Sequence, residues 1–352
     1  MKKLKVLFNT SKGSFDNQGG GEIQLLETKA GLEKLGHSVK IFEQENYSVD
    51  IGNFDIFHNF NIHRDNYGFV AEAKAKGVPV AISTIYWSAL GRALSWNTSI
   101  SDKLKLVGVE LINRFDFANL SKVRKMVQMV DVLLPNSVAE AMQLEKIFGV
   151  DKNKIKVVHN GVEERFAKAS PKLFEENHDL GSFALYVGRI EERKNVLKLI
   201  NSFNSLERKE KLVIIGSAAE KDQQYFEKCR RTAGANVLFL PPLPHNSKML
   251  ESIYAACKVF CLPSWYETPG LAALEAGLAG ANLVVTSEGC TREYFGEHAL
   301  YANPADSKDI AEKIKIGLDK AKGKALSNHI QENFLWKNAA LETVEAYAGV
   351  VK

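Results

Sequence analysis

Short apolar runs alternate along the chain with longer stretches whose apolar residues fall at helical spacing. This alternation predicts parallel strands joined by helical crossovers. In the first half we expect strands at 5–9, 38–42, 55–59, 78–83, 132–135 and 155–159. The helices expected among them cover 21–35, 66–76, 119–130 and 137–148.

The same rhythm restarts in the second half. Strands are expected at 183–187, 211–215, 237–240, 259–262 and 282–286, and a helix follows at 308–318. The segment 163–181 is highly charged, contains a proline and has no apolar period, so we expect it to be a linker. A last helical pattern runs over 329–350 with no strand after it.

These patterns predict an α/β protein of two doubly wound, Rossmann-like domains that face each other across a central cleft. The first domain is expected at 1–165 and the second at 180–328, with the linker between them. In such sheets ligands bind at the carboxyl ends of the strands.

Composition narrows the class of protein. The 352 residues are 45% hydrophobic and 25% charged, as in a packed globular protein, and the net charge is only +4. The four cysteines are scattered without metal-ligand spacing, which favours reduced thiols in a cytoplasmic protein. The apolar run after Met1 ends at Phe8, too short for a signal peptide, and no run reaches the roughly 18 apolar residues of a membrane span.

Two glutamates bracket the start of a predicted helix in Glu267-Thr-Pro-Gly-Leu-Ala-Ala-Leu-Glu275. The first four residues are typical of a turn, and Leu271 begins an apolar helical stripe. The free N–H groups of a helix start suit a phosphate, and a carboxylate suits a vicinal diol such as ribose. The pair therefore indicates a site for a sugar nucleotide.

A cationic cluster follows the first strand of the second half. Gly188-Arg189 and Lys194-Asn195 place two cations at a strand end, where they suit phosphate oxygens. A solvated run of charge is the alternative, because Glu191, Glu192 and Arg193 lie within it. The chain contains no Asp-x-Asp, so we expect these cations and the helix start to neutralise a leaving diphosphate without a metal.

Three further motifs follow predicted strands of the first half. Gly19-Gly20-Gly21 allows close backbone approach to a ligand, although a flexible loop is the alternative. Asn136 precedes Ser137, which also reads as a helix N-cap with Glu140 three residues later. Asn160 precedes a glycine, which also reads as a plain turn.

Taken together, these motifs resemble the retaining glycosyltransferases of the GT-B fold in the large glycosyl transferase group 1 family, family four. The likeness spans nearly the whole chain and is strongest over 185–195 and 262–304. The stretch from Ser264 to Leu271 and the later Thr291-Arg-Glu-Tyr-Phe-Gly resemble members that act in polysaccharide biosynthesis.

The resemblance implies roles for individual residues. Arg189 and Lys194 would bind the donor diphosphate, Glu275 the ribose, and Glu267 the transferred hexose. The implied catalytic group is Glu267, Arg189 and Lys194. The implied donor site comprises Gly188, Arg189, Lys194, Glu267, Thr268, Pro269, Gly270, Leu271 and Glu275. The implied phosphate and acceptor side comprises Gly19, Gly20, Gly21, Asn136, Asn160 and Tyr86. The terminal helix, about 329–352, would cross back to the first domain.

One departure from the family concerns the catalytic base. Many relatives carry a histidine after the strand expected at 78–83, where this chain reads Thr84-Ile85-Tyr86-Trp87. His58 or His63, after the preceding strand, would be the stand-ins, although a lone histidine is more often structural. Alternatively, the leaving phosphate takes the acceptor proton and no protein base is needed.

The segment 86–120 carries Trp87, Trp96, Phe115 and Phe117 among basic residues. A helical excursion packed on its own domain is one interpretation. The other is an acceptor site or a membrane-surface patch for a lipid-linked acceptor. From the cysteine pattern and the short first apolar run we expect a cytoplasmic protein, either free or peripheral at the inner face of the membrane.

The sequence and the resemblance together predict a metal-independent, retaining hexosyltransferase. It would move a hexose from a nucleotide diphosphate sugar, with UDP or GDP as carrier, to a hydroxyl of a glycan or lipid-linked acceptor. No cofactor and no nucleic-acid partner is expected. A sugar-nucleotide epimerase on the same fold and a non-catalytic nucleotide-sugar-binding partner subunit remain as alternatives.

Overall fold

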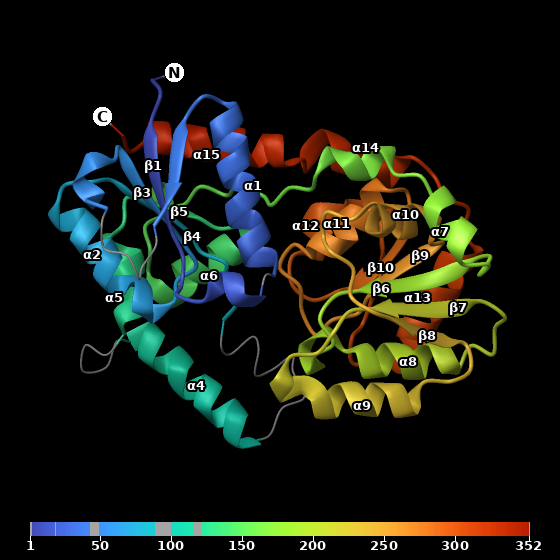
Figure 1. The fold of residues 1–352 in the computed structure, drawn as a ribbon. Helices are drawn as coiled ribbons and strands as arrows, with labels where there is room; N and C mark the ends of the chain where they lie inside the picture. Colours follow the sequence, from blue (N-terminus) through green and yellow to red (C-terminus); the bar gives the residue numbers. More distant parts are fainter. Residues whose placement is uncertain (1, 18, 43–48, 89–99, 116–120, 352) are drawn as a thin grey trace. The chain divides into compact units, whose positions relative to one another are not determined.

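The computed structural model describes residues 2–17, 19–42, 49–88, 100–115 and 121–351 (Figure 1). The chain divides into two units. The first unit comprises Met1–Gly161 and Trp336–Lys352, and the second comprises Val162–Leu335.

The first unit is built on a five-stranded parallel sheet with the order β2-β1-β3-β4-β5. Its strands are β1 Lys5–Asn9, β2 Ser38–Ile41, β3 Ile56–Phe60, β4 Val80–Ser83 and β5 Val132–Leu134. Every residue of β3, β4 and β5 is buried. Burial on both faces explains why these strands read as continuous apolar runs in the sequence.

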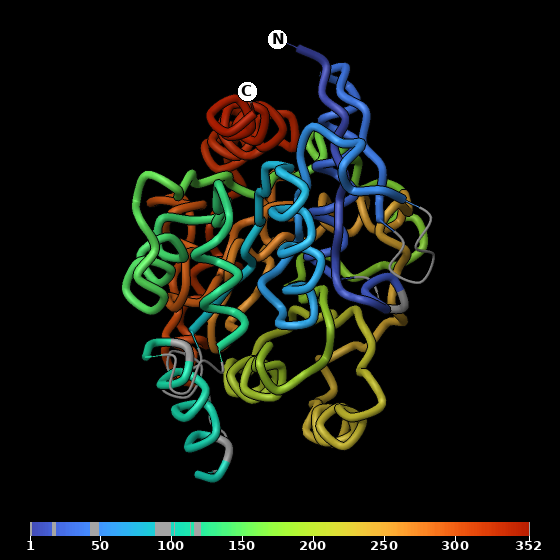
Figure 2. The backbone as a smooth tube through the Cα atoms, turned by 90° about the vertical axis from the view of Figure 1, so that its left-hand side faces the viewer, coloured from blue at the N-terminus to red at the C-terminus, as the bar shows by residue number. Residues whose placement is uncertain are grey.

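The described part of the first unit also contains helices. They are α1 Gly20–Lys34, α2 Tyr67–Ala75, α4 Ile100–Phe115, α5 Lys122–Met129, α6 Val138–Phe148 and α15 Trp336–Ala348. Helix α15, from the end of the chain, packs on α1 so closely that a Cβ added at Gly31 would lie 2.6 Å from that of Ala340. Helix α4 (teal) projects away from the sheet in both ribbon and tube views (Figures 1 and 2).

The second unit is built on a six-stranded parallel sheet with the order β11-β10-β9-β6-β7-β8. Its strands are β6 Phe183–Val187, β7 Lys211–Ile215, β8 Val237–Leu240, β9 Val259–Leu262, β10 Asn282–Thr286 and β11 Leu300–Ala302. Its helices are α7 Lys172–Asn177, α8 Val196–Asn204, α9 Gln223–Thr232, α10 Lys248–Ala256, α11 Leu271–Leu278, α12 Thr291–Phe295, α13 Ser307–Asp319 and α14 Ala325–Asn333.

Both sheets are doubly wound, as the sequence predicts. The strand order turns back between β1 and β3 in the first unit and between β6 and β9 in the second. Open α/β sheets bind ligands beyond the carboxyl ends of the strands at such a switch point. The loops after β6 and β9 are therefore the first place to look for a site in the second unit.

Three local predictions are wrong. The strand expected at 155–159 is a single bridge from Ile155 to Leu133, because β5 is itself only three residues long. The expected linker is folded into the second unit: a 3-10 turn, Glu164–Lys168, leads to α7, and Phe166 and Phe174 are buried. The sequence analysis also missed the short edge strand β11.

The third wrong prediction is the single helix expected over 329–350, which is broken into α14 and α15. Leu335 forms a parallel bridge with Val162, and the Val162 N–H donates to the carbonyl of Phe334 at 2.8 Å. Extended backbone at this point interrupts the helical path. The break is thus set by a partner far away in the sequence.

Candidate functional site

The loop after β6 is held tightly at its start. Gly188 has φ +155°, and the Tyr186 hydroxyl donates to the carbonyl of Arg189 at 2.6 Å. A Cβ at Gly216, after β7, would lie 1.9 Å from the Gly188 carbonyl oxygen, so the two loops touch through bare backbone. The side chain of Arg189 is exposed beyond this junction.

The loop then turns and places Lys194 beside Glu267. The 3-10 turn Glu192–Lys194 ends at Asn195, whose backbone is left-handed with φ +59°. The Asn195 side chain donates to the carbonyls of Pro263 and Pro304, at 3.0 and 2.9 Å. This anchor joins the loops after β6 and β9. The Lys194 Nζ consequently lies 2.6 Å from Oε1 of Glu267.

Arg193 is a second cation at this point, which the sequence analysis treated as part of a charge run. Its guanidinium lies 3.7 Å from Glu267 and 2.9 Å from Glu191. It also faces the ring of Tyr266 at 5.5 Å. The sequence places Arg193 next to Lys194, but only the fold shows that its side chain faces Glu267.

Charge and burial act against each other in this cluster. Burial raises the pKa of the Glu267 carboxyl, but Lys194 and Arg193 outweigh it, so the pKa is lowered overall. For Lys194, burial and the neighbouring Arg193 lower the pKa, although Glu267 acts in the opposite direction. Glu267 is therefore held as a carboxylate, and Lys194 is less strongly basic than an exposed lysine.

The segment from Glu267 to Leu271 is held by a second loop. The Cys290 N–H donates to the carbonyl of Glu267 at 3.1 Å, and the Cys290 thiol donates to that of Thr268 at 2.9 Å. Pro269 is buried, and Gly270, with φ +72°, is the N-cap of α11. The predicted turn followed by a helix start is confirmed.

Glu275 lies in the second turn of α11 and is buried. Its two carboxylate oxygens each have a protein partner: Oε1 is 2.8 Å from His245 Nε2, and Oε2 accepts from the Tyr254 hydroxyl at 2.8 Å. The sequence analysis did not anticipate either partner. His245 follows β8 and Tyr254 belongs to α10, so only tertiary structure brings them to Glu275.

The candidate residues of the first unit follow strand ends. Gly19 is the N-cap of α1, and its N–H donates to the Glu22 carboxylate at 2.7 Å. The backbone N–H groups of Tyr86 and Asn136 both donate to buried Glu140, at 2.5 and 2.8 Å, which ties the ends of β4 and β5 together.

Several of these first-unit side chains lie deep in the fold. Ser137 is the N-cap of α6 and accepts from the Glu140 N–H at 3.1 Å, as the capping interpretation predicts. Asn136 and Asn160 are buried, and the Tyr86 ring meets Phe148 edge-on with ring centroids 5.2 Å apart. The roles expected for Gly20, Gly21 and these residues on the acceptor side stay predictions.

His58 is a core residue. It is fully buried, with Nε2 2.9 Å from the Ser83 hydroxyl and Nδ1 2.5 Å from that of Tyr347. Burial lowers the pKa of His58 to about 3. Both ring nitrogens are thus engaged, and the geometry argues against His58 as a base for an acceptor. His63 is exposed and pairs with Asp65 at 3.1 Å.

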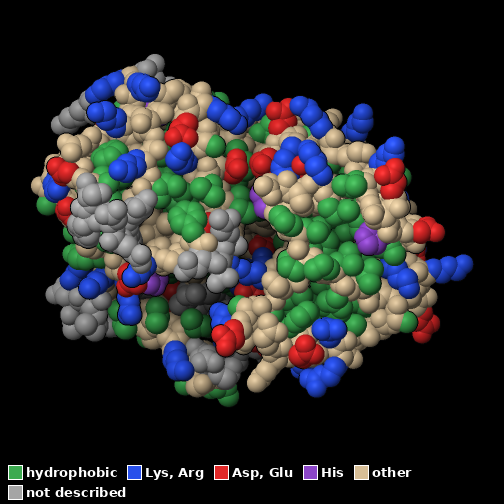
Figure 3. Space-filling model, viewed as in Figure 1, with side chains coloured by type: hydrophobic (Ala, Val, Ile, Leu, Met, Phe, Trp, Pro, Cys, Tyr) green, Lys and Arg blue, Asp and Glu red, His purple; other side chains and the backbone are tan. Residues whose placement is uncertain are grey.

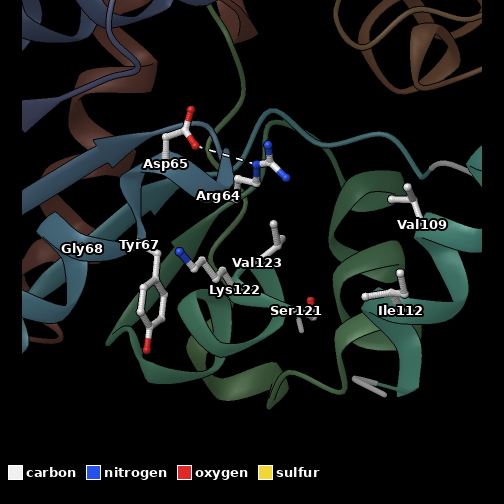
Figure 4. A pocket seen from close by; sticks show the side chains of 9 residues that line it. All are labelled: Arg64, Asp65, Tyr67, Gly68, Val109, Ile112, Ser121, Lys122 and Val123. Carbon is white, nitrogen blue, oxygen red and sulfur yellow. Dashed lines mark ion pairs between the residues drawn. The ribbon is translucent and has the colours of Figure 1, made fainter. Parts of the chain in front are cut away.

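A cavity of about 910 Å³ opens on the first unit (Figure 4). Val109 and Ile112 of α4 point toward Val123 of α5, and Lys122 extends toward the side where Tyr67 lies. It is lined by Arg64, Asp65, Tyr67, Gly68, Val109, Ile112, Ser121, Lys122 and Val123. The cavity combines an apolar wall with two cations, Arg64 and Lys122, and one carboxylate, Asp65, which lies 3.8 Å from Arg64.

Within the described ranges, no cluster of three His, Cys, Asp or Glu side chains is arranged to hold a metal ion. Among the helices that the structure describes, none combines the length and apolar composition of a membrane span.

A comparison with protein families finds a match within the second unit. Residues 172–333 match the model described as glycosyl transferases group 1, which lies within the bounds of that unit. The second unit is therefore similar to the glycosyl transferase group 1 family.

Two of the curated relatives of this chain have stated activities. The O-antigen chain mannosyltransferase B of Escherichia coli is 29% identical over 176 residues, 47% of this chain and 45% of that protein. A D-inositol 3-phosphate glycosyltransferase of Kribbella flavida is 30% identical over 253 residues, 65% of this chain and 59% of that protein. The chain thus spans about half the length of these relatives.

Solved structures show the same fold at low sequence identity. Sucrose-phosphate synthase from Thermosynechococcus elongatus has a TM-score of 0.76 at 14% identity, over 98% of each chain. Anabaena Alr3699/HepE in complex with UDP and glucose has a TM-score of 0.69 at 18% identity, over 99% of this chain and 100% of that one. The fold class predicted from the sequence, α/β of the GT-B type, is confirmed.

Proposed function

We propose that this protein is a retaining glycosyltransferase that moves a hexose from a nucleotide diphosphate sugar to an acceptor hydroxyl without a metal. The observation that carries the proposal is the contact between Lys194 and Glu267 at the switch point of the second sheet. A buried cation and carboxylate at a strand end suit the two parts of such a donor, its diphosphate and its sugar. The match of residues 172–333 to the glycosyl transferase group 1 model and the names of the relatives support the same class of reaction.

In the proposed donor site, Arg189 and Lys194 neutralise the diphosphate, and the N–H groups at the start of α11 add to them. Glu267 accepts hydrogen bonds from hexose hydroxyls, and Glu275 from the ribose. Because Lys194 already contacts Glu267, one ammonium group can hold the carboxylate in place and face an arriving phosphate oxygen.

The proposed reaction breaks the bond between the anomeric carbon and the diphosphate oxygen and forms one to the acceptor oxygen. The leaving phosphate oxygen takes the acceptor proton. The burial and full hydrogen bonding of His58 favour this route over a base at that position. The side chains of the second unit then act by stabilising the charge that develops on the diphosphate.

For the acceptor we propose a lipid-linked or glycan hydroxyl compound bound by the first unit. The cavity beside α4 offers apolar side chains and the cations Arg64 and Lys122. On the same helix, Ile100, Leu104, Leu111 and Phe115 are exposed and fall on one face. Such a helix, interleaved with Lys103, Lys105 and Arg114, suits the surface of an anionic membrane.

Charge on the rest of the visible surface is mixed. On the face shown in Figure 3, Lys and Arg side chains lie among Asp and Glu over both units. Membrane attachment through net charge is therefore less favoured than attachment through the apolar face of α4, at the inner, cytoplasmic side of the membrane.

A thermal-shift screen with UDP, GDP, ADP and their hexose derivatives tests the donor proposal. A ligand that binds only the folded state raises the melting temperature, so one nucleotide class is expected to do so. Product analysis with that sugar nucleotide follows. Transfer to added acceptor supports the proposal, whereas a changed sugar on the same nucleotide indicates the epimerase, and binding without turnover indicates a partner subunit.

Liposome flotation tests the membrane proposal. Leu104→Glu and Leu111→Glu are expected to abolish binding to vesicles containing anionic phospholipid, because a charge on the apolar face opposes insertion. Leu341→Glu, at an exposed leucine of α15, is the matched control and is expected to bind like the parent protein. Trp87→Ala and Trp96→Ala extend the test, although Trp96 lies outside the described residues. Absence of binding by the unmodified protein would reject the membrane proposal.

A further inference from the structure

Glu275 is a buried carboxylate whose orientation is fixed from two sides. Burying an anion is costly unless hydrogen bonds replace water. Here His245 Nε2 meets Oε1 and the Tyr254 hydroxyl meets Oε2, both at 2.8 Å. A carboxylate has about four lone-pair sites, so roughly two stay available for further donors. Two is the number that a vicinal diol requires.

The hydrogen bond from His245 also defines the state of its ring. A carboxylate can only accept, so Nε2 carries a proton whether the imidazole is neutral or charged. Protonation at Nδ1 therefore changes the charge of His245 without removing its bond to Glu275. The His245 side chain is about one-third exposed, at 35%, so Nδ1 can exchange its proton with solvent.

The surroundings of His245 contain charges of both signs. Glu275 belongs to α11. Glu163 and Arg165 lie in the segment before α7, and a Glu163 oxygen is 3.7 Å from Nε2 of His245. The Arg165 guanidinium donates to the His245 carbonyl at 2.8 Å and pairs with Glu163 at 2.7 Å and Glu251 at 3.0 Å. From α10 come Tyr254, Glu251 and Lys248, the last paired with Glu251 at 2.9 Å.

These charges favour the imidazolium form of His245. The hydrogen bond to Glu275 raises the pKa of His245 above its ordinary value, helped by the charges of Glu275 and Glu163. Burial and Arg165 act in the opposite direction. Most of the charge of Arg165 is already compensated by its own two glutamates.

We propose that His245 is a positioning residue for the nucleotide: with Tyr254 it aims the Glu275 carboxylate at the ribose diol, and its imidazolium adds positive charge that favours an anionic nucleotide. This inference rests on the proposed function, because it assumes that a nucleotide binds to the second unit. It adds a pH-sensitive group at a distance from the reacting phosphate. By linkage, nucleotide affinity then falls as pH rises and His245 loses its charge.

Calorimetric titration of the full chain with UDP, GDP and ADP, from pH 6 to pH 9, tests this. Each nucleotide is compared with its 2′,3′-dideoxy form, and the parent protein with His245→Gln. The glutamine amide can still donate to Glu275 but cannot become charged. We expect His245→Gln to weaken ribonucleotide binding about 10-fold at pH 6, and the ratio of the two Kd values to fall toward unity at pH 9. Titration of the phosphates themselves cancels in that ratio.

The dideoxy arm separates positioning from a general charge effect. His245→Gln keeps a donor to Glu275, so its Kd ratio is expected to be the same for both sugar forms. Tyr254→Phe removes a donor to Glu275, so for that variant a smaller Kd ratio with dideoxynucleotides than with ribonucleotides supports an action through Glu275. If His245→Gln fails to fold, Tyr254→Phe takes its place: it is expected to weaken ribonucleotide binding about 10-fold and to keep the parent's dependence on pH. Three results would each overturn this inference alone: a Kd ratio for His245→Gln that stays constant with pH, equal Kd ratios for both sugar forms in Tyr254→Phe, or a Tyr254→Phe variant that binds ribonucleotides like the parent. Absence of binding by the parent protein to all three nucleotides overturns the proposed function itself.

Discussion

Gly289 tests how the second unit positions Glu267. It lies in the loop after β10 and forms a parallel bridge with Glu267. Its φ is +100°, and a Cβ would lie 1.9 Å from the Glu267 carbonyl oxygen. Ordinary contact begins at 3.4 Å, so Gly289→Ala must separate the two backbones by about 1.5 Å, the difference between 3.4 and 1.9 Å.

The effect has two parts that a control can separate. A left-handed backbone costs an alanine about 1–2 kcal/mol wherever it occurs. Gly280 shares that cost, because its φ is +93°, but it has nothing within 4 Å of an added Cβ. Gly280→Ala therefore measures the conformational term, and the excess in Gly289→Ala measures the collision.

Movement of Glu267 also affects activity. Its carboxylate must stay within reach of Lys194, now 2.6 Å away. Misplacing a positioned group by about 1 Å lowers turnover roughly 100-fold. We therefore expect Gly289→Ala to lose about 100-fold in donor turnover and Gly280→Ala to keep nearly all of it.

The assay measures chemical denaturation and release of nucleoside diphosphate for both variants. Gly289→Ala should be less stable than Gly280→Ala and should have much lower turnover. If the two variants lose the same stability and retain the same turnover, the bridge to Glu267 does not position the site.

Two other predictions concern buried titratable side chains. Lys194→Met and Glu267→Gln each leave a buried charge without its partner, so each is expected to lower the free energy of unfolding by about 3 kcal/mol. The double variant should lower it by less than the sum of the two, by at least ~1 kcal/mol. Strictly additive losses in chemical denaturation would contradict a coupled pair. His58 stays neutral in the fold because its pKa is lowered to about 3. Its contribution to stability is therefore present above the unfolded pKa of about 6.5 and is lost as pH falls, by about 2 kcal/mol at pH 5. Measuring the free energy of unfolding at pH 7 and at pH 5 gives this loss. The loss should persist in His63→Gln and disappear in His58→Gln. An equal loss in both variants would show that His58 does not cause it.

Much of the fold was readable because parallel strands buried on both faces appear as uninterrupted apolar runs. Strands β6 and β9 are examples, since their residues are almost all buried. Strand β11 was missed because it is three residues long and half-buried. The break between α14 and α15 was missed because it depends on pairing between Leu335 and Val162, far apart in the chain.

The candidate site was predictable where its chemistry is local. The cations after β6 and the paired glutamates around the start of α11 stand in short motifs at strand ends. His245 and Tyr254 carried no such signal, because they reach Glu275 from a different loop and a different helix. The direction of Arg193 likewise depends on the loop that carries Tyr266.

Donor turnover by Arg189→Ala tests the proposed function most directly. The Arg189 side chain is exposed, so its loss should leave the melting temperature nearly unchanged. Lys315→Ala, at an exposed lysine of α13 in the same unit, is the control for a lost positive charge. A diphosphate site at the end of β6 predicts at least a ~10-fold loss of nucleoside diphosphate release for Arg189→Ala and none for Lys315→Ala. Equal turnover by the two variants would contradict it.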